Sequence, residues 1–242
     1  MAKTTFAHHN TYSQKGNSKS RSVRDICAEA GREQGAAPHV EMPTKPEILQ
    51  GLNPSNIPDL IESRVKEQNK TLREMRKAET TKEKGIRKDT HVLSAAVFSY
   101  PDPVGQTDKE DYQRWREDVV QFANKDCRRQ GLEVLSIIEH TDEAHPHIHV
   151  LSAPHIKPLS RLHVANPRMD AKRCHDGHKA QAAHIERGLH GSPSRSYKAA
   201  MRNWQDRYHE QVGPVPSNNY FRQDLPIPAQ DVPKLKKNGT KT

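Results

Sequence analysis

Cysteine is scarce in this chain of 242 residues, and Cys27, Cys127 and Cys174 form no C-x-x-C pair. An odd number of widely spaced cysteines argues against a disulfide framework and against a zinc site built from thiolates. We expect all three to be ordinary reduced residues. The chain also lacks any apolar stretch near the roughly 18 residues that cross a bilayer, and its first nine residues lack the apolar run of a secretion signal. We therefore expect a cytoplasmic protein without a membrane span.

Aromatic residues are also few, at 5%, and hydrophobic residues make up only 32% against 29% charged residues. This composition predicts a modest core that is diluted by long polar helices or disordered ends. The 39 Lys and Arg exceed the 30 Asp and Glu, which gives a net charge of +9. Such an excess favours a polyanionic partner, namely nucleic acid, although a membrane surface fits the charge equally well.

Apolar periodicity and turn residues predict an ordered series of elements along the chain. They are a strand at 4–12, a helix at 22–32 capped by Ser22 and Asp25, an extended connection at 34–56, a long charged helix at 58–84 closed by Gly85, a strand at 91–100, a helix capped by Thr107 and Glu110 that ends near Gly131, strands at 132–139 and 147–153, long loops at 154–193, and a helix at 194–212.

This order predicts an α/β (α+β) fold in which helices flank an antiparallel sheet. The last two strands should be antiparallel neighbours because only about six residues join them. We assign residues 1–213 to one folded domain that includes the long charged helix. Residues 214–242 are rich in proline and basic at their end, so we expect a disordered tail.

Histidines gather where those two strands meet, in the segment His140-Thr-Asp-Glu-Ala-His-Pro-His-Ile-His149. Alternate side chains of a strand share a face, so His147 and His149 project together, and a tight hairpin brings His140 beside them. Three imidazoles within reach of one point predict a metal site. Glu143 can add a carboxylate oxygen, and Asp142 can orient an imidazole by accepting its N–H. Nitrogen and carboxylate ligands suit Mn²⁺, Zn²⁺ or another borderline ion. The alternative to a metal site is a chance cluster, because the chain has 15 histidines.

The string H-x-D-E-x-x-P-H-x-H resembles the metal motif of MobV-type (Mob/Pre) mobilisation relaxases, which belong to the HUH endonuclease superfamily. His140, Glu143, His147 and His149 fall at the positions of that family's ligands. Looser similarity covers residues 22–32, 38–40 and 197–208. The resemblance implies an HUH-type sheet and a relaxase that binds single-stranded or hairpin DNA at a plasmid origin of transfer, with other mobilisation or coupling proteins as further partners. It also implies a site-specific nick that depends on Mn²⁺ or Mg²⁺, with Zn²⁺ as an alternative, and a covalent adduct with the 5′ phosphate.

The attacking residue is less defined, because MobV-type enzymes are associated with a histidine in an N-terminal H-N-x-R-like motif. Here His9-Asn10 begins like that motif but lacks the arginine, whereas Ala28-Glu-Ala-Gly-Arg32 keeps the arginine and has Glu29 where the histidine is expected. His9, Tyr12 and Glu29 are therefore alternative nucleophiles, each able to form a phosphoryl adduct, and Arg32 is a candidate catalytic residue.

Two other functions fit parts of the sequence. A rolling-circle initiator or transposase of the HUH class would attack with Tyr197 or Tyr208, although their helical spacing favours packing for both. A non-catalytic DNA-binding mobilisation accessory would use the histidines only structurally. For DNA contacts we expect the basic loops to supply phosphate ligands. The candidates are His39, Arg161, Lys172, Arg173 and Lys179.

Overall fold

The structure is a computed structural model that describes residues 6–18, 20–80, 82, 84–155 and 168–212. The segment expected to form a basic tail, 214–242, lies outside the described residues, as does Arg161. No helix in the described ranges is long and apolar enough to cross a membrane. The three cysteines are buried and free, as expected.

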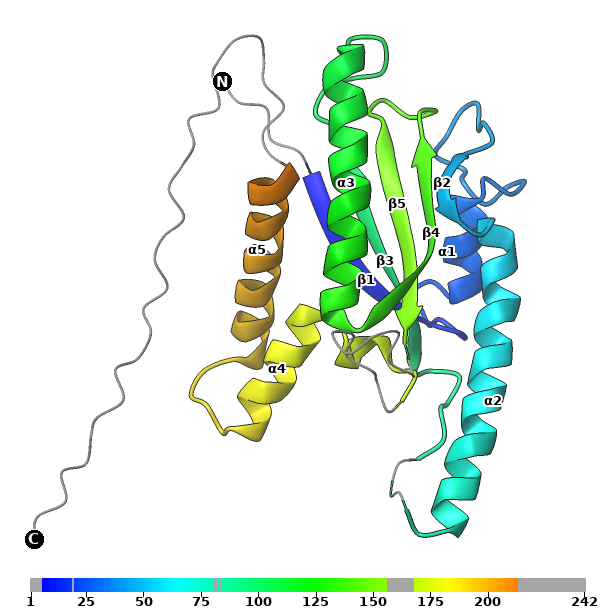
Figure 1. Ribbon diagram of the computed structural model, residues 1–242, viewed down its shortest axis with the longest axis vertical. Coiled ribbons are helices and arrows are strands. Elements are labelled where there is room, and N and C mark those ends of the chain that lie inside the picture. The colour runs from blue at the N-terminus through cyan, green and yellow to red at the C-terminus, as the bar shows by residue number, and fades with distance from the viewer. Residues whose placement is uncertain (1–5, 19, 81, 83, 156–167, 213–242) are drawn as a thin grey trace, which may run out of the picture.

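The centre of the molecule is a five-stranded sheet in which every neighbouring pair is antiparallel (Figure 1). Its order is β1-β3-β5-β4-β2. The strands are β1 (Phe6–Ser13), β2 (Glu47–Gly51), β3 (His91–Ser99), β4 (Leu132–His140) and β5 (His147–Pro154). The helices are α1 (Val23–Ala30), α2 (Ile57–Lys77), α3 (Lys109–Gln130), α4 (Asp176–Glu186) and α5 (Pro193–Val212), with short 3-10 helices η1 (Pro54–Asn56) and η2 (Ala171–Arg173). The predicted fold class is confirmed.

Helices cover both faces of the sheet, α3 and α5 on one side and α1 and α2 on the other (Figure 1). Phe98 and Ile148 from the sheet pack with Trp204 of α5 in the first core. Leu151 packs with Ile61 of α2 in the second core. Because successive side chains of a strand point to opposite faces, each central strand contributes to both cores.

Helix ends follow local capping rules. The Ser22 hydroxyl accepts a hydrogen bond from the Asp25 N–H, and the Asp25 carboxylate accepts one from the Ser22 N–H. The predicted capping box of α1 is therefore confirmed. The cap of α3 is Asp108, which accepts from the Glu110 N–H, and not Thr107 as expected. That helix ends at Gly131 as predicted, with φ +81°.

The long charged helix is shorter than expected. It ends at Lys77, because Glu79 takes a left-handed conformation with φ +59° and the Thr80 N–H bonds back to the Met75 carbonyl. These two features form a Schellman ending, which satisfies the last carbonyls of the helix. The lysines after Lys77 therefore do not extend α2 as far as Gly85.

Two connections expected to lack regular structure contain short elements. The extended segment 34–56 holds β2 and η1, and the loops at 154–193 hold η2 and α4. β2 is an edge strand of five residues that ends at Gly51, where φ is +86° and the backbone passes close to the Leu135 carbonyl. Such short elements have too few residues for a clear periodic pattern.

Candidate metal centre

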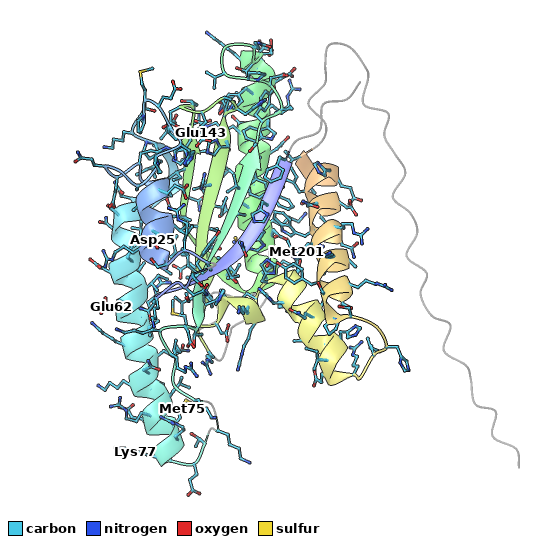
Figure 2. The ribbon with its side chains drawn as sticks, turned by 180° about the vertical axis from the view of Figure 1, so that it is seen from behind. Asp25, Glu62, Met75, Lys77, Glu143 and Met201 are labelled. Carbon is cyan, nitrogen blue, oxygen red and sulfur yellow. The ribbon has the colours of Figure 1, made fainter. Side chains whose placement is uncertain are left out.

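Three histidines meet at the β4–β5 hairpin. His140 ends β4 and pairs with His147, the first residue of β5, while His149 lies two residues further along the same face. One nitrogen from each ring lies within 4.8 Å of the other two. The convergence predicted from strand alternation is what the structure shows. Figure 2 marks this end of the sheet with Glu143, which lies in the turn of the hairpin.

The neighbours of these histidines along β5 show on which face of the sheet the three imidazoles lie. Ile148 and Val150 belong to the core beneath α3 and α5. Leu151, which shares a face with His149, belongs to the core beneath α1 and α2. The three imidazoles therefore project toward α1.

Backbone carbonyls orient two of the rings. His140 Nε2 lies 2.9 Å from the carbonyl of Ala30 at the end of α1, and His147 Nδ1 lies 3.1 Å from the carbonyl of His145. Since a carbonyl can only accept, these nitrogens carry the hydrogens and the opposite nitrogens carry lone pairs. His140 Nδ1 and His147 Nε2 then face each other at 3.2 Å. Two facing lone pairs repel, and a bound cation would remove this repulsion, so the donor set of His140, His147 and His149 fits a metal.

Electrostatics keep two of the rings neutral near pH 7. Burial lowers the pKa of His140 to about 4, and the nearby Arg32 charge acts in the same direction. Burial, followed by His140 and His147, lowers the pKa of His149 well below its ordinary value. Neutral imidazole is the form that binds a metal, so these two rings need not lose a proton on binding.

Arg32 connects α1 to the hairpin turn. It has φ +53°, an uncommon conformation for a residue other than glycine, and follows the last turn of α1. Its guanidinium donates to both Asp142 oxygens, at 2.9 and 2.8 Å, and to Glu143 Oε1 at 2.7 Å. The side chains of Arg32 and Asp142 are only 2% and 1% exposed. Such a buried, bidentate pair fixes the turn that holds two of the histidines in register.

The two acidic residues of the turn have different surroundings. Asp142 was expected to orient an imidazole, but it binds Arg32 and accepts the Thr44 N–H at 3.0 Å. Burial would raise the pKa of this carboxyl, yet the hydrogen bonds from Arg32 and Thr44 outweigh it and the net shift is downward. Glu143 Oε1 lies 3.6 Å from His147 Nε2, beside the three imidazoles and bonded to Arg32.

Glu29 lies next to this centre, on the last turn of α1. Its carboxylate is 20% exposed, pairs with Arg21, and lies 4.0 Å from His39 Nε2. The same His39 nitrogen is 3.5 Å from Glu143 Oε1, and the His39 side chain is 52% exposed. Glu29, His39 and Glu143 thus form a continuous line of polar groups that ends beside the three histidines.

Tyr12 shares the face of the sheet with the histidines but lies further away. It pairs with Leu93, whereas His149 pairs with Val97, four residues along the same strand and about 13 Å distant at the usual rise. Burial, and after it the Glu29 charge, raises the pKa of the Tyr12 hydroxyl. Its phenol is therefore less readily ionised than a free tyrosine.

His9 is on the wrong side of the sheet for the role of nucleophile. Its ring is 2.5 Å from Ser94 Oγ, and the ring centroids of His175 and Trp204 lie 4.4 and 5.3 Å away, in the layer of α4 and α5. The side chain is only 5% exposed. His9 pairs with Ala96 of the core beneath α3 and α5, so the sheet separates it from the three imidazoles on the other face, and this expectation is corrected.

The alternative tyrosine nucleophiles also lie on that opposite side. Tyr208 is 0% exposed and its hydroxyl accepts from Trp115 Nε1 at 3.1 Å. Tyr197 stacks on His175 with centroids 5.7 Å apart. The packing role that helical spacing favoured is confirmed for both, and neither can reach the metal centre.

The basic residues expected to contact DNA are remote from the metal centre. Lys172 and Arg173 belong to η2 and Lys179 to α4, so they do not lie in loops. Lys172 lies near His91, the first residue of β3, because its charge lowers the pKa of that histidine. The candidate metal site is at the other end of β3, where Ser99 pairs with His147. All three cations are exposed at the far end of the sheet.

Sequence reasoning missed Arg21 and Thr44, which contact Glu29 and Asp142 respectively. Arg21 immediately precedes the helix cap at Ser22, so its proximity to α1 was available from the sequence. The contact of Thr44 with Asp142 spans 98 residues and leaves no local signal.

The fold and the site define an α/β protein with a candidate histidine metal site on two adjacent strands of an antiparallel sheet, the central strand β5 and its neighbour β4. The family model Mob_Pre, described as plasmid recombination enzyme, matches residues 45–214. This match covers well over half of the sequence. The chain belongs to the plasmid recombination enzyme (Mob_Pre) family, and the resemblance indicated by the histidine motif is confirmed.

Two solved structures are similar to the chain at low identity. One is the MobM relaxase domain (MOBV; Mob_Pre) bound to 26-nucleotide pMV158 oriT DNA, with 15% identity, a TM-score of 0.43, and coverage of 91% of this chain and 96% of that one. The other is the same domain bound to pMV158 oriT DNA of 22 nucleotides with a 3′ thiophosphate, in a Mn-bound crystal structure, with 12% identity, a TM-score of 0.38, and coverage of 78% and 88%. No curated protein matches the sequence.

Proposed function

We propose that this member of the plasmid recombination enzyme family is a relaxase. It binds an origin of transfer as single-stranded or hairpin DNA, nicks one strand at a defined site, and stays attached to the 5′ phosphate. The observation that carries the proposal is the set of three imidazoles whose inward nitrogens lie within 4.8 Å of one another, beside α1. The net charge of +9 supports a nucleic-acid partner.

His140, His147 and His149 would hold a divalent metal, with Glu143 able to add a carboxylate oxygen after it releases Arg32. When bound, the ion would polarise the scissile phosphate and stabilise negative charge that develops on its oxygens. Mn²⁺ fits three nitrogen donors better than Mg²⁺, which prefers oxygen ligands, and Zn²⁺ is also compatible.

For the nucleophile we propose Glu29. Its carboxylate is linked to the metal ligands through His39 and Glu143, whereas Tyr12 lies further along the sheet. In the nick, a Glu29 oxygen forms a bond to phosphorus, the bond from phosphorus to the 3′ oxygen breaks, and the released 3′ oxygen takes a proton. The half-exposed His39 supports a phosphate contact at this point.

The adduct chemistry tests this assignment directly. A carboxylate nucleophile gives an acyl phosphate, which neutral hydroxylamine cleaves, whereas a tyrosine phosphodiester resists it. We expect wild-type protein with Mn²⁺ to form a hydroxylamine-sensitive adduct on origin DNA, and Glu29→Gln to bind that DNA without forming one. Glu33→Gln, which changes an exposed carboxylate four residues away, serves as the matched control. A hydroxylamine-resistant adduct that disappears in Tyr12→Phe would instead assign the role to Tyr12.

The proposed activity also bears on where the protein acts and on the non-catalytic alternative. A plasmid-nicking enzyme acts on cytoplasmic DNA, so we propose a cytoplasmic location. If the wild-type protein binds origin DNA normally but never nicks it with Mn²⁺, Mg²⁺ or Zn²⁺, the chain is instead a DNA-binding mobilisation accessory.

A further inference from the structure

A cavity of about 520 Å³ lies beside α1 and α2, at the end of α1 remote from the metal centre. Figure 2 labels Glu62, which lines it from α2, and Asp25 on the neighbouring α1. Its wall combines the end of β1, the first residues of α1, one side of α2, and the segment before β3. The lining residues are Gln14, Lys15, Val23, Arg24, Pro58, Glu62, Val65, Lys66, Asn69, Ile86 and Lys88.

The wall carries a clear excess of positive charge. Four cations line it against one carboxylate, Glu62, which pairs with Lys66 at 2.7 Å. Arg24 forms a looser, exposed pair with Asp59 at 3.4 Å. Within the described ranges, no carboxylate lies within ion-pair distance of the remaining two cations, Lys15 and Lys88. Unneutralised lysines around a hollow attract a phosphate group.

The same cavity offers a floor for a flat, partly apolar group. Val23, Val65 and Ile86, all buried, form an apolar part of its wall. Asn69 is occupied, because its amide binds both the N–H and the carbonyl of Ile86. Gln14 is half-buried, and its amide bonds to none of the residues that the structure describes. A volume of this size is ordinary for a small-molecule site and accommodates a single nucleotide.

Position connects the cavity to the metal centre. A second hollow, of about 500 Å³, shares Lys15 and extends to Arg21. Arg21 in turn pairs with Glu29 beside the metal ligands. Val23 and Ala30 stand at opposite ends of α1, about 11 Å apart at the helical rise. A strand of DNA that leaves the metal centre past Arg21 therefore meets this cavity within a short distance.

We propose that the cavity binds one nucleotide of the DNA strand held at the metal centre, with its phosphate at Lys15 and Lys88 and its base against the apolar wall beside Gln14. This inference rests on the proposed function, because it takes the ligand to be the same strand. A free mononucleotide has the same chemistry and is the competing source.

The test is an abasic scan of single-stranded origin DNA, in which each oligonucleotide lacks one base, with the full-length protein and Mn²⁺. We expect wild-type binding to weaken about fivefold or more at one position, since loss of the base removes its apolar contact with Val23, Val65 and Ile86. Gln14→Ala and the double variant Lys15→Ala/Lys88→Ala should lose this dependence. The double variant should also lower the salt slope of binding by about 0.7, the value for one single-strand phosphate.

The control is Lys125→Ala/Lys198→Ala, which removes two exposed lysines from α3 and α5 on the other side of the sheet. It should keep both the abasic penalty and the salt slope. Titration of the protein with each of the four free deoxynucleoside monophosphates tests the competing source, a free mononucleotide. If one of them binds in a manner that depends on Lys15 and Lys88, while the scan shows no coupled position, the assignment to the DNA strand is overturned.

The two proposals fail in different ways. If wild-type protein binds and nicks origin DNA but no abasic position is coupled to Gln14 or the lysines, only the cavity assignment is wrong. If wild-type protein neither binds nor nicks origin DNA, the proposed function fails and the cavity assignment fails with it.

Discussion

Replacement of Arg32 by alanine should destabilise the protein and loosen the metal centre together. The guanidinium is bonded to Asp142 and Glu143, and the Arg32 and Asp142 side chains are nearly inaccessible to solvent. Removal of one partner from a buried ion pair leaves the other charge uncompensated and costs about 3–5 kcal/mol. Because the Thr44 N–H stays on Asp142, we expect the lower end, about 3 kcal/mol. That value lowers the ratio of folded to unfolded protein more than a hundredfold.

Urea unfolding of the metal-free protein, followed by tryptophan fluorescence, measures this loss. Trp115 and Trp204 are both buried in the core beneath α3 and α5, so their emission reports global unfolding. The matched control is Arg24→Ala, whose partner Asp59 is 81% exposed and whose own side chain is 70% exposed. An exposed pair of this kind contributes at most about 1 kcal/mol.

Arg32→Gly separates the ion pair from the backbone. Glycine accepts the left-handed conformation at φ +53° without strain, so it should recover up to about 1 kcal/mol relative to Arg32→Ala. All substitutions at Arg32 should also weaken Mn²⁺ binding by roughly tenfold or more in calorimetry, since residues that orient metal ligands have effects of that size. If Arg32→Ala costs no more stability than Arg24→Ala, the buried connection between α1 and the hairpin turn is refuted.

Three further predictions concern other parts of the fold. Gly51→Ala should cost ~2 kcal/mol in urea unfolding, because φ is +86° and a Cβ would lie 2.2 Å from the Leu135 carbonyl oxygen; an unchanged midpoint would contradict this. Burial, with help from His175, lowers the pKa of His178 to about 4, so below pH 6.5 the unfolded chain binds a proton there that the folded protein does not. The free energy of unfolding should therefore fall as the pH is lowered from 6.5 to 4. His178→Gln should reduce the slope of this fall by about half of the full 1.4 kcal/mol per pH unit, since the ring is partly exposed. Equal slopes for the variant and the wild-type protein would exclude the effect. Tyr208→Phe should cost about 1 kcal/mol by removing an acceptor and leave nicking unchanged, whereas a well-folded variant without nicking activity would return Tyr208 to the list of nucleophiles.

The histidine centre was predictable from the sequence because its geometry is local. His147 and His149 share a face by strand alternation, and the hairpin connection is short enough to bring His140 beside them. The caps of α1 and the end of α3 at Gly131 were likewise local signals. These features depend on residues a few positions apart.

Features that depend on sheet order and long-range contacts were not predictable. Nothing near His9 indicates that its side of β1 would be covered by α4 and α5, which follow more than 160 residues later, and this decides that it cannot attack (Figure 1). The bond between Arg32 and Asp142 spans 110 residues. Lys172 and Lys179 were assigned by charge alone, and charge does not specify the end of the sheet at which a residue lies.

The central claim is tested most directly by detection of a covalent adduct between the protein and labelled single-stranded origin DNA on a denaturing gel. With Mn²⁺ we predict an adduct and a free 3′-OH product for the wild-type protein, and the loss of both after chelation of the metal or in His147→Ala/His149→Ala. His190→Ala, which changes an exposed histidine after α4, should retain both products. Undiminished adduct formation by the double histidine variant, or by wild-type protein without metal, would contradict the account.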